Sequence, residues 1–142
     1  MAALYLVDTS VWIFAVRRNP QPAIRNRVAA LLEMDQIAIC GLVELELLGG
    51  AANAGEFSRL KARLHGLHRF SIGDLEWEAA AESAFALRRL GVTVPFTDVL
   101  LAAVALRHNA ILLHADRDFD LIAKHTALDV ESLADLVTPA EP

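Results

Sequence analysis

Short apolar runs alternate with longer amphipathic segments along this chain, and no other feature limits its possible folds as strongly. The runs that suit buried strands cover residues 4–7, 37–40, 69–72, 111–115 and 128–130. Strands that are separated by helices predict a parallel sheet covered on both faces. We therefore predict a single α/β domain over residues 1–142, with three α/β/α layers and a central parallel sheet of four or five strands.

The segments between these runs carry helix start and stop signals. Pro22 stands where a helix can begin, and Gly50 and Gly91 stand where helices can end. The predicted helices cover residues 11–16, 22–32, 42–48, 56–66, 76–90, 97–108 and 116–124. The fourth predicted strand therefore follows the most apolar helix of the chain.

Composition bounds the class of protein. Hydrophobic residues make up 55% and charged residues 22%, which indicates a globular core. The longest uninterrupted apolar run, residues 99–106, is far shorter than the roughly 20 residues of a membrane helix, and no basic secretory leader is visible. A lone cysteine, Cys40, cannot form an internal disulfide and is predicted to be a small core residue. We predict a cytoplasmic protein with no membrane partner.

Three acids are predicted to share one edge of the sheet. Asp8 follows the first strand, Asp116 follows the fourth, and Asp98 opens the apolar helix. The carboxyl ends of parallel strands lie along one edge, where ligands bind in open α/β sheets. Asp118 is close enough to share the pocket, whereas Asp120 is expected to face water.

Each acid can also be explained without a ligand, as a helix cap or a turn residue. That explanation is weaker for the group, because Thr9, Ser10 and Thr97 are adjacent and can do the capping themselves. Two carboxylates about 4 Å apart repel by roughly 4 kcal/mol at an effective dielectric constant of 20, so such a cluster requires a cation or a shared proton. Oxygen ligands select Mg²⁺ or Mn²⁺. We assign the nearest histidine, His114, a supporting or structural role.

The basic residues are unevenly distributed although the net charge is −5. Four arginines and no acid lie between Thr9 and Leu32, and a second basic stretch covers residues 59–69. Such patches attract phosphates even on an acidic protein, but solvated arginines on two helices explain them equally well.

Four motifs in order carry a resemblance to a known family. They are LVDTSVW at residues 6–12, ELLGG at 46–50, FTDVLLAAVAL at 96–106 and HADRDFDLI at 114–122. The chain resembles a PIN-domain ribonuclease, specifically the VapC-type toxin of bacterial toxin–antitoxin pairs. The motifs span almost the whole chain.

The resemblance implies a set of site residues. The implied metal ligands are Asp8, Asp98, Asp116 and Asp118, and the implied residues beside them are Thr9, Ser10 and Thr97. The family pattern places a glycine four residues after its glutamate, which selects Glu46 with Gly50 over Glu44. Glu46 then completes the catalytic set with Asp8, Asp98 and Asp116 or orients the attacking water.

The implied activity is hydrolysis of RNA phosphodiester bonds with one or two Mg²⁺ or Mn²⁺ ions. Arg17, Arg18 and Arg117 are candidates for holding substrate phosphates, although Arg117 can instead pair with Asp116 or Asp118. The implied partners are a VapB-like antitoxin and a second copy of the chain.

The aromatic residues are candidates for these interfaces. Trp12 and Phe14 are candidates for the antitoxin contact or for the core. Trp77 is predicted to lie in the core or at a dimer interface.

Other protein classes also gather acids at such an edge. A receiver-like domain needs a lysine near the pocket, and Lys61 and Lys124 are badly placed for this. A phosphatase of the haloacid dehalogenase type needs an acid where the chain has Ser10. A catalytically inactive PIN module that acts as a binding scaffold remains open, although no acid of the set is missing.

Overall fold

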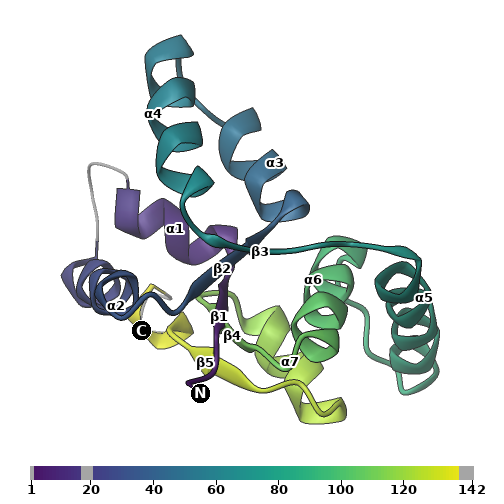
Figure 1. Cartoon of the computed structure of the whole chain (residues 1–142). Helices are drawn as coiled ribbons and strands as arrows, with labels where there is room; N and C mark the ends of the chain where they lie inside the picture. Colours follow the sequence, from purple (N-terminus) through teal and green to yellow (C-terminus); the bar gives the residue numbers. More distant parts are fainter. Residues whose placement is uncertain (1, 17–20, 138–142) are drawn as a thin grey trace.

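The computed structural model describes residues 2–16 and 21–137. Its centre is a sheet of five parallel strands in the order β3-β2-β1-β4-β5 (Figure 1). The strands are β1 (Tyr5–Val7), β2 (Ile37–Cys40), β3 (His68–Phe70), β4 (Ile111–His114) and β5 (Val130–Ser132). The predicted parallel sheet is therefore confirmed, with five strands.

Among the described residues, seven α-helices connect and cover the strands. They are α1 (Thr9–Val16), α2 (Pro22–Glu33), α3 (Gly41–Gly49), α4 (Ala54–His65), α5 (Asp74–Arg89), α6 (Phe96–Arg107) and α7 (Arg117–His125). Figure 1 shows α1 and α2 on one side of the sheet and α5, α6 and α7 on the other, while α3 and α4 extend beyond its edge. The predicted three-layer arrangement is confirmed. A short 3₁₀ helix, Ala134–Leu136, was not predicted.

The core lies on both faces of the sheet and around α6. All four residues of β2 are buried, as an interior strand of a parallel sheet requires. Seven consecutive residues of α6, from Val99 to Ala105, are also buried, because this helix lies between the sheet and α5. Cys40 is part of this core, as predicted. None of the helices in the described part of the chain is long and apolar enough to cross a membrane.

Polar contacts join the outer elements to the centre. Arg27 on α2 donates to both carboxylate oxygens of Glu131 on β5, at 2.7 and 2.8 Å. On the other side, the buried Glu76 of α5 accepts from the backbone N–H of Gly73 and lies 3.8 Å from Arg107. These contacts join α2 to the edge strand β5 and α5 to α6.

Candidate functional site

Asp8 and Asp116 lie at the point where the strand order of the sheet reverses. Asp8 directly follows β1, and Asp116 follows β4 after one residue. These strands are neighbours in the sheet although β1 connects along the chain to β2 on its other side. Such a switch point opens a crevice at the carboxyl ends of the strands. Asp98 reaches the same crevice from the first turn of α6.

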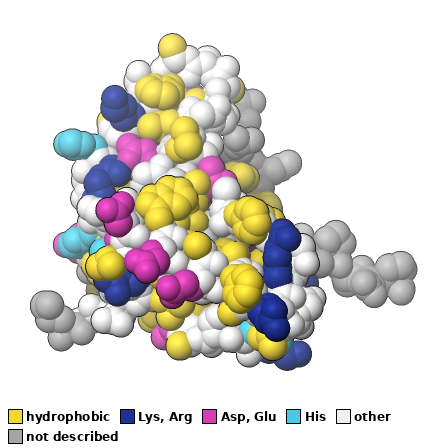
Figure 2. All heavy atoms as spheres, turned by 90° about the vertical axis from the view of Figure 1, so that its right-hand side faces the viewer, with side chains coloured by type: hydrophobic (Ala, Val, Ile, Leu, Met, Phe, Trp, Pro, Cys, Tyr) yellow, Lys and Arg dark blue, Asp and Glu magenta, His cyan; other side chains and the backbone are white. Residues whose placement is uncertain are grey.

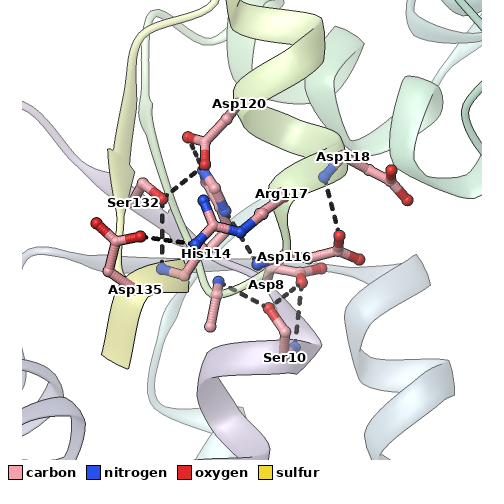
Figure 3. Close-up of polar contacts among 11 residues, drawn as sticks. Asp8, Ser10, His114, Asp116, Arg117, Asp118, Asp120, Ser132 and Asp135 are labelled. Atoms are coloured by element: carbon pink, nitrogen blue, oxygen red, sulfur yellow. Dashed lines mark hydrogen bonds and ion pairs between the residues drawn. The ribbon is translucent and has the colours of Figure 1, made fainter. Parts of the chain in front are cut away.

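Three carboxylates meet at this crevice. One oxygen from each of Asp98, Asp116 and Asp118 lies within 4.8 Å of the other two, and all three residues are partly buried. The backbone N–H of Asp118 donates to Asp116 Oδ1 at 2.9 Å, so Asp116 caps α7 while facing Asp118 (Figure 3). We call these three residues together with Asp8 and Glu46 the acid cluster.

Asp8 is held in place by Ser10. The hydroxyl of Ser10 donates to Asp8 Oδ2 at 2.6 Å, and its backbone N–H donates to the same oxygen at 3.1 Å. The prediction that Thr9 and Ser10 cap α1 in place of Asp8 is therefore wrong. Asp8 accepts the capping hydrogen bond itself, because the Ser10 hydroxyl accepts from the backbone N–H of Ala115, which follows β4.

Glu46 lies beside Asp8 and Glu44 does not. The Thr9 hydroxyl donates to Glu46 Oε1 at 3.1 Å. Glu44 lies on a different side of α3, where it pairs with Arg69 at 2.5 Å. The glutamate selected from the family pattern is thus the one that approaches the other acids.

The charges of the acid cluster repel one another. Burial and the negative charges of Asp116, Asp8, Asp118 and Glu46 raise the pKa of Asp98 to about 7. Burial is also the largest cause of the raised pKa values of Asp8, Glu46 and Asp118. Each of these acids therefore lies where ionisation is disfavoured unless a positive charge is present.

The donor set fits a hard divalent cation. Three carboxylates offer only oxygen ligands, and Mg²⁺ and Mn²⁺ prefer oxygen. Asp98, Asp116 and Asp118 are the residues placed to share such an ion. Asp8 belongs to the same crevice, but its Oδ2 is already occupied by Ser10.

Asp120 stays outside the acid cluster and its side chain is 38% exposed, as expected, but it also makes contacts that were not predicted. Asp120 Oδ1 lies 3.2 Å from Nε2 of the fully buried His114, at an angle poorly aligned for a hydrogen bond, and Asp120 Oδ2 accepts from the Ser132 hydroxyl. Nδ1 of His114 accepts from the backbone N–H of Asp116. Burial lowers the pKa of His114, so the ring is neutral. A histidine in an otherwise apolar strand is the sequence signal that points to such a contact. The signal does not identify the residues involved, Asp120 of α7 and Ser132 of β5.

No contact between the described residues joins the arginine predicted to bind phosphate, Arg117, to the acid cluster. Arg117 pairs with Asp135 at 2.8 Å rather than with Asp116 or Asp118, because the 3₁₀ helix after β5 brings Asp135 alongside α7. Arg17 and Arg18 lie outside the described residues. Thr97 is exposed in the first turn of α6 and does not cap it, since the helix begins one residue earlier, after Pro95.

The chain is similar to known proteins over most of its length. The PIN domain family model matches residues 5–125. Ribonuclease VapC11 of Mycobacterium tuberculosis (strain H37Rv) is 36% identical over 132 residues, which cover 91% of this chain and 98% of that protein. Ribonuclease VapC18 of the same strain is 32% identical over 132 residues, with 90% of this chain and 93% of that protein covered.

A solved structure shares the fold. The crystal structure of VapBC2 from Rickettsia felis, bound to a DNA fragment from its promoter, matches with a TM-score of 0.73 at 22% identity, over 91% of this chain and 98% of that chain. The family model and the relatives cover the segment that holds all five members of the acid cluster. The chain therefore belongs to the PIN-domain family and, within it, to the VapC group.

Proposed function

We propose that this protein is a VapC-like endoribonuclease that hydrolyses RNA phosphodiester bonds with the help of Mg²⁺ or Mn²⁺. The observation that carries the proposal is the convergence of Asp98, Asp116 and Asp118 at a sheet switch point, where the pKa of Asp98 is about 7. Burial and the neighbouring negative charges disfavour ionisation of this carboxyl, and a bound cation would offset both costs. The names of the relatives, which are ribonucleases, support RNA as the substrate.

When bound, a divalent cation would supply Lewis acidity and neutralise charge on the phosphate. Asp98, Asp116 and Asp118 would hold it. Glu46 Oε2, the oxygen not engaged by Thr9, accepts a proton from the attacking water, and burial raises the pKa of this carboxyl as a general base requires. Ser10 and Thr9 fix the rotamers of Asp8 and Glu46.

The substrate phosphates require cations beside the cluster. Arg117 begins α7, directly after Asp116, and more than half of its side chain is exposed. Its partner Asp135 is 90% exposed, so the pair is weak and can exchange for a phosphate. Arg17 and Arg18 stay candidates for the same role.

We further propose that the partner is a VapB-like antitoxin, which binds grooves around α1. One groove of about 440 Å³ and another of about 330 Å³ share Val16 and Arg63 in their linings. Trp12 lines the second groove, and its buried Nε1 has no hydrogen-bond partner among the described residues. Arg25, Arg59 and Arg63 outnumber Glu56, the acid that lines these grooves, so the rim suits an acidic segment with apolar anchors. A similar solved structure is VapBC-5 of Mycobacterium tuberculosis, from the VapBC family of toxin–antitoxin systems.

The outer face of α5 supports the proposed homodimer. Trp77, Phe85 and the neighbouring Phe96 of α6 are each more than half exposed around a shallow groove floored by alanines. Figure 2 shows hydrophobic side chains mixed with acidic and basic ones on this side of the molecule. An antiparallel pair of α5 helices centred on Ala81 would place Trp77 opposite Phe85 of the second copy and Asp74 opposite its Arg88. This self-complementarity is what a two-fold interface requires.

The alternative of an inactive binding scaffold predicts a different result in a direct assay. Purified protein is incubated with total RNA and Mn²⁺, then with EDTA, and then with Mn²⁺ restored, while the new RNA ends are sequenced. The proposed function predicts cleavage that EDTA stops and Mn²⁺ restores. Tight protein binding without cleavage of any RNA would favour the scaffold, and cleavage unaffected by EDTA would contradict the metal dependence.

We place this activity in the cytoplasm, where Cys40 stays reduced.

A further inference from the structure

His114 is the one fully buried histidine among the described residues, and both of its ring nitrogens face named atoms. Nδ1 accepts from the backbone N–H of Asp116 at 3.2 Å. A nitrogen that accepts an N–H carries no proton, so the ring proton is on Nε2, which lies 3.2 Å from Asp120 Oδ1. The Nδ1 end of the ring is therefore fixed by a hydrogen bond, whereas Nε2 lies close to Asp120 without a well-aligned one.

The contacts of His114 continue outward to the edge of the sheet. Asp120 Oδ2 accepts from the Ser132 hydroxyl at 2.9 Å, which ties α7 to β5 (Figure 3). The Phe119 ring lies 5.2 Å from the histidine ring and is tilted by 48° against it, so packing also limits rotation of the imidazole. The contacts of His114 thus link α7 and β5 to the segment that carries Asp116.

We propose that His114 is a positioning residue for the acid cluster, which acts by holding the backbone N–H of Asp116. That bond fixes the peptide from which the Asp116 side chain projects, and the Asp118 N–H then fixes Asp116 Oδ1 from the other side. The carboxylates of Asp116 and Asp118 are thereby kept at the separation that suits one cation. This inference rests on the proposed metal-dependent function.

Two amide substitutions separate the roles of the ring nitrogens. In His114→Asn, the side-chain oxygen lies close to the former Nδ1 and can still accept from Asp116 N–H. In His114→Gln, the amide reaches toward Asp120 but leaves Asp116 N–H without its acceptor. We expect His114→Asn to keep the Kd for Mn²⁺ within about 3-fold of the original, and His114→Gln and His114→Leu to weaken it about 10-fold or more, as loss of a partner of a ligand does.

The readout is equilibrium Mn²⁺ binding, measured beside thermal unfolding of the metal-free protein. Leu112→Ala is the control, because Leu112 is buried in the same strand and is apolar. Weaker Mn²⁺ binding in His114→Gln, but not in an equally destabilised Leu112→Ala, would support the inference. Equal affinities for all three histidine variants, the reverse order of His114→Asn and His114→Gln, or an equal loss in Leu112→Ala would each overturn it.

A further pair of samples separates this inference from the proposed function. If the original protein binds Mn²⁺ and Asp98→Asn does not, the metal site is established and only the histidine variants decide. If the original protein does not bind Mn²⁺, the proposed metal dependence fails and the role of His114 fails with it.

Discussion

The carboxyl of Asp98 couples the acid cluster to pH. Its pKa is about 7 in the absence of metal, against an ordinary value of 3.8, so the folded protein binds this proton more tightly than the unfolded chain does. The stability gained from that proton is complete below about pH 4 and is lost as the pH rises through about 7. We expect the Tm of metal-free protein, measured by calorimetry, to fall as the pH rises from about 5 to about 7 and to level off above about pH 8.

Two comparisons test this pH dependence. Mn²⁺ should raise the Tm at about pH 8 much more than at about pH 6, because protons compete with the cation for the carboxylates. The decline without metal should be shallower in Asp98→Asn, which removes the titrating group. An identical decline in the original protein and in Asp98→Asn would show that Asp98 does not carry the effect.

The two glutamates of α3, Glu44 and Glu46, allow a matched pair of substitutions. Glu46 receives the Thr9 hydroxyl beside Asp8, whereas Glu44 pairs with Arg69 away from the cluster. Glu46→Gln should lower kcat for RNA cleavage by about 100-fold or more, as loss of a general base does. Glu44→Gln should change kcat by less than about 5-fold, because an exposed ion pair stabilises by at most about 1 kcal/mol. A larger loss in Glu44→Gln would reverse the assignment.

At the scale of elements, Ser10 joins α1 to the segment after β4. Its hydroxyl donates to Asp8 and accepts from Ala115 N–H. Ser10→Ala should leave that N–H without an acceptor, at a cost of about 1–3 kcal/mol in the free energy of unfolding, and weaken Mn²⁺ binding about 10-fold. Denaturant titration and Mn²⁺ titration measure the two effects. Ser58→Ala, on the exposed side of α4, is the control, and equal behaviour of both variants would contradict the role of Ser10.

The elements themselves follow from local sequence, and their polar contacts mostly do not. The predicted runs contain the three inner strands β1, β2 and β4, because a parallel strand buried on both faces needs such a run. The edge strands only overlap their predicted runs, since β3 begins one residue earlier and β5 shares only Val130 with its run. The capping residue at the start of α1 was predicted wrongly. Asp8 caps the helix in place of Ser10, because the Ser10 hydroxyl accepts from Ala115 N–H, which belongs to a segment distant in the sequence.

The part of the candidate site that lies at the ends of strands could be predicted from the sequence. Asp8 and Asp116 converge because parallel strands share one edge, and the family pattern selected Glu46. The pairing of Arg117 with Asp135 could not be predicted, because it depends on how the segment after β5 returns to α7. The contact between Asp120 and His114 could not be predicted either, because it also depends on Ser132 of β5, which donates to Asp120.

At the scale of the whole molecule, the α5 face predicts an assembly of two copies. Ala81 lies at the centre of the antiparallel arrangement, so Ala81→Glu would bring two carboxylates together at the two-fold axis. We expect this substitution to convert a dimer to a monomer in sedimentation velocity experiments, without a change in the helical circular dichroism signal.

The matched control for this change is Ala30→Glu, an exposed alanine on α2, far from α5 in the sequence. That variant should sediment as the original protein does. Dimers of unchanged stability in Ala81→Glu, or a monomer in the original protein at concentrations of tens of micromolar, would contradict the proposed interface.

If the acid cluster holds the cation with which the protein cuts RNA, cleavage depends both on that cation and on the carboxylates. The most direct measurement is the initial rate of RNA cleavage as a function of Mn²⁺ concentration in the original protein, Asp98→Asn and Asp129→Asn. Asp129 is exposed directly before β5, so Asp129→Asn makes the same chemical change outside the cluster. We expect saturable, Mn²⁺-dependent cleavage that Asp98→Asn lowers by about 100-fold or more and Asp129→Asn leaves unchanged. Equal cleavage by Asp98→Asn and the original protein would contradict it.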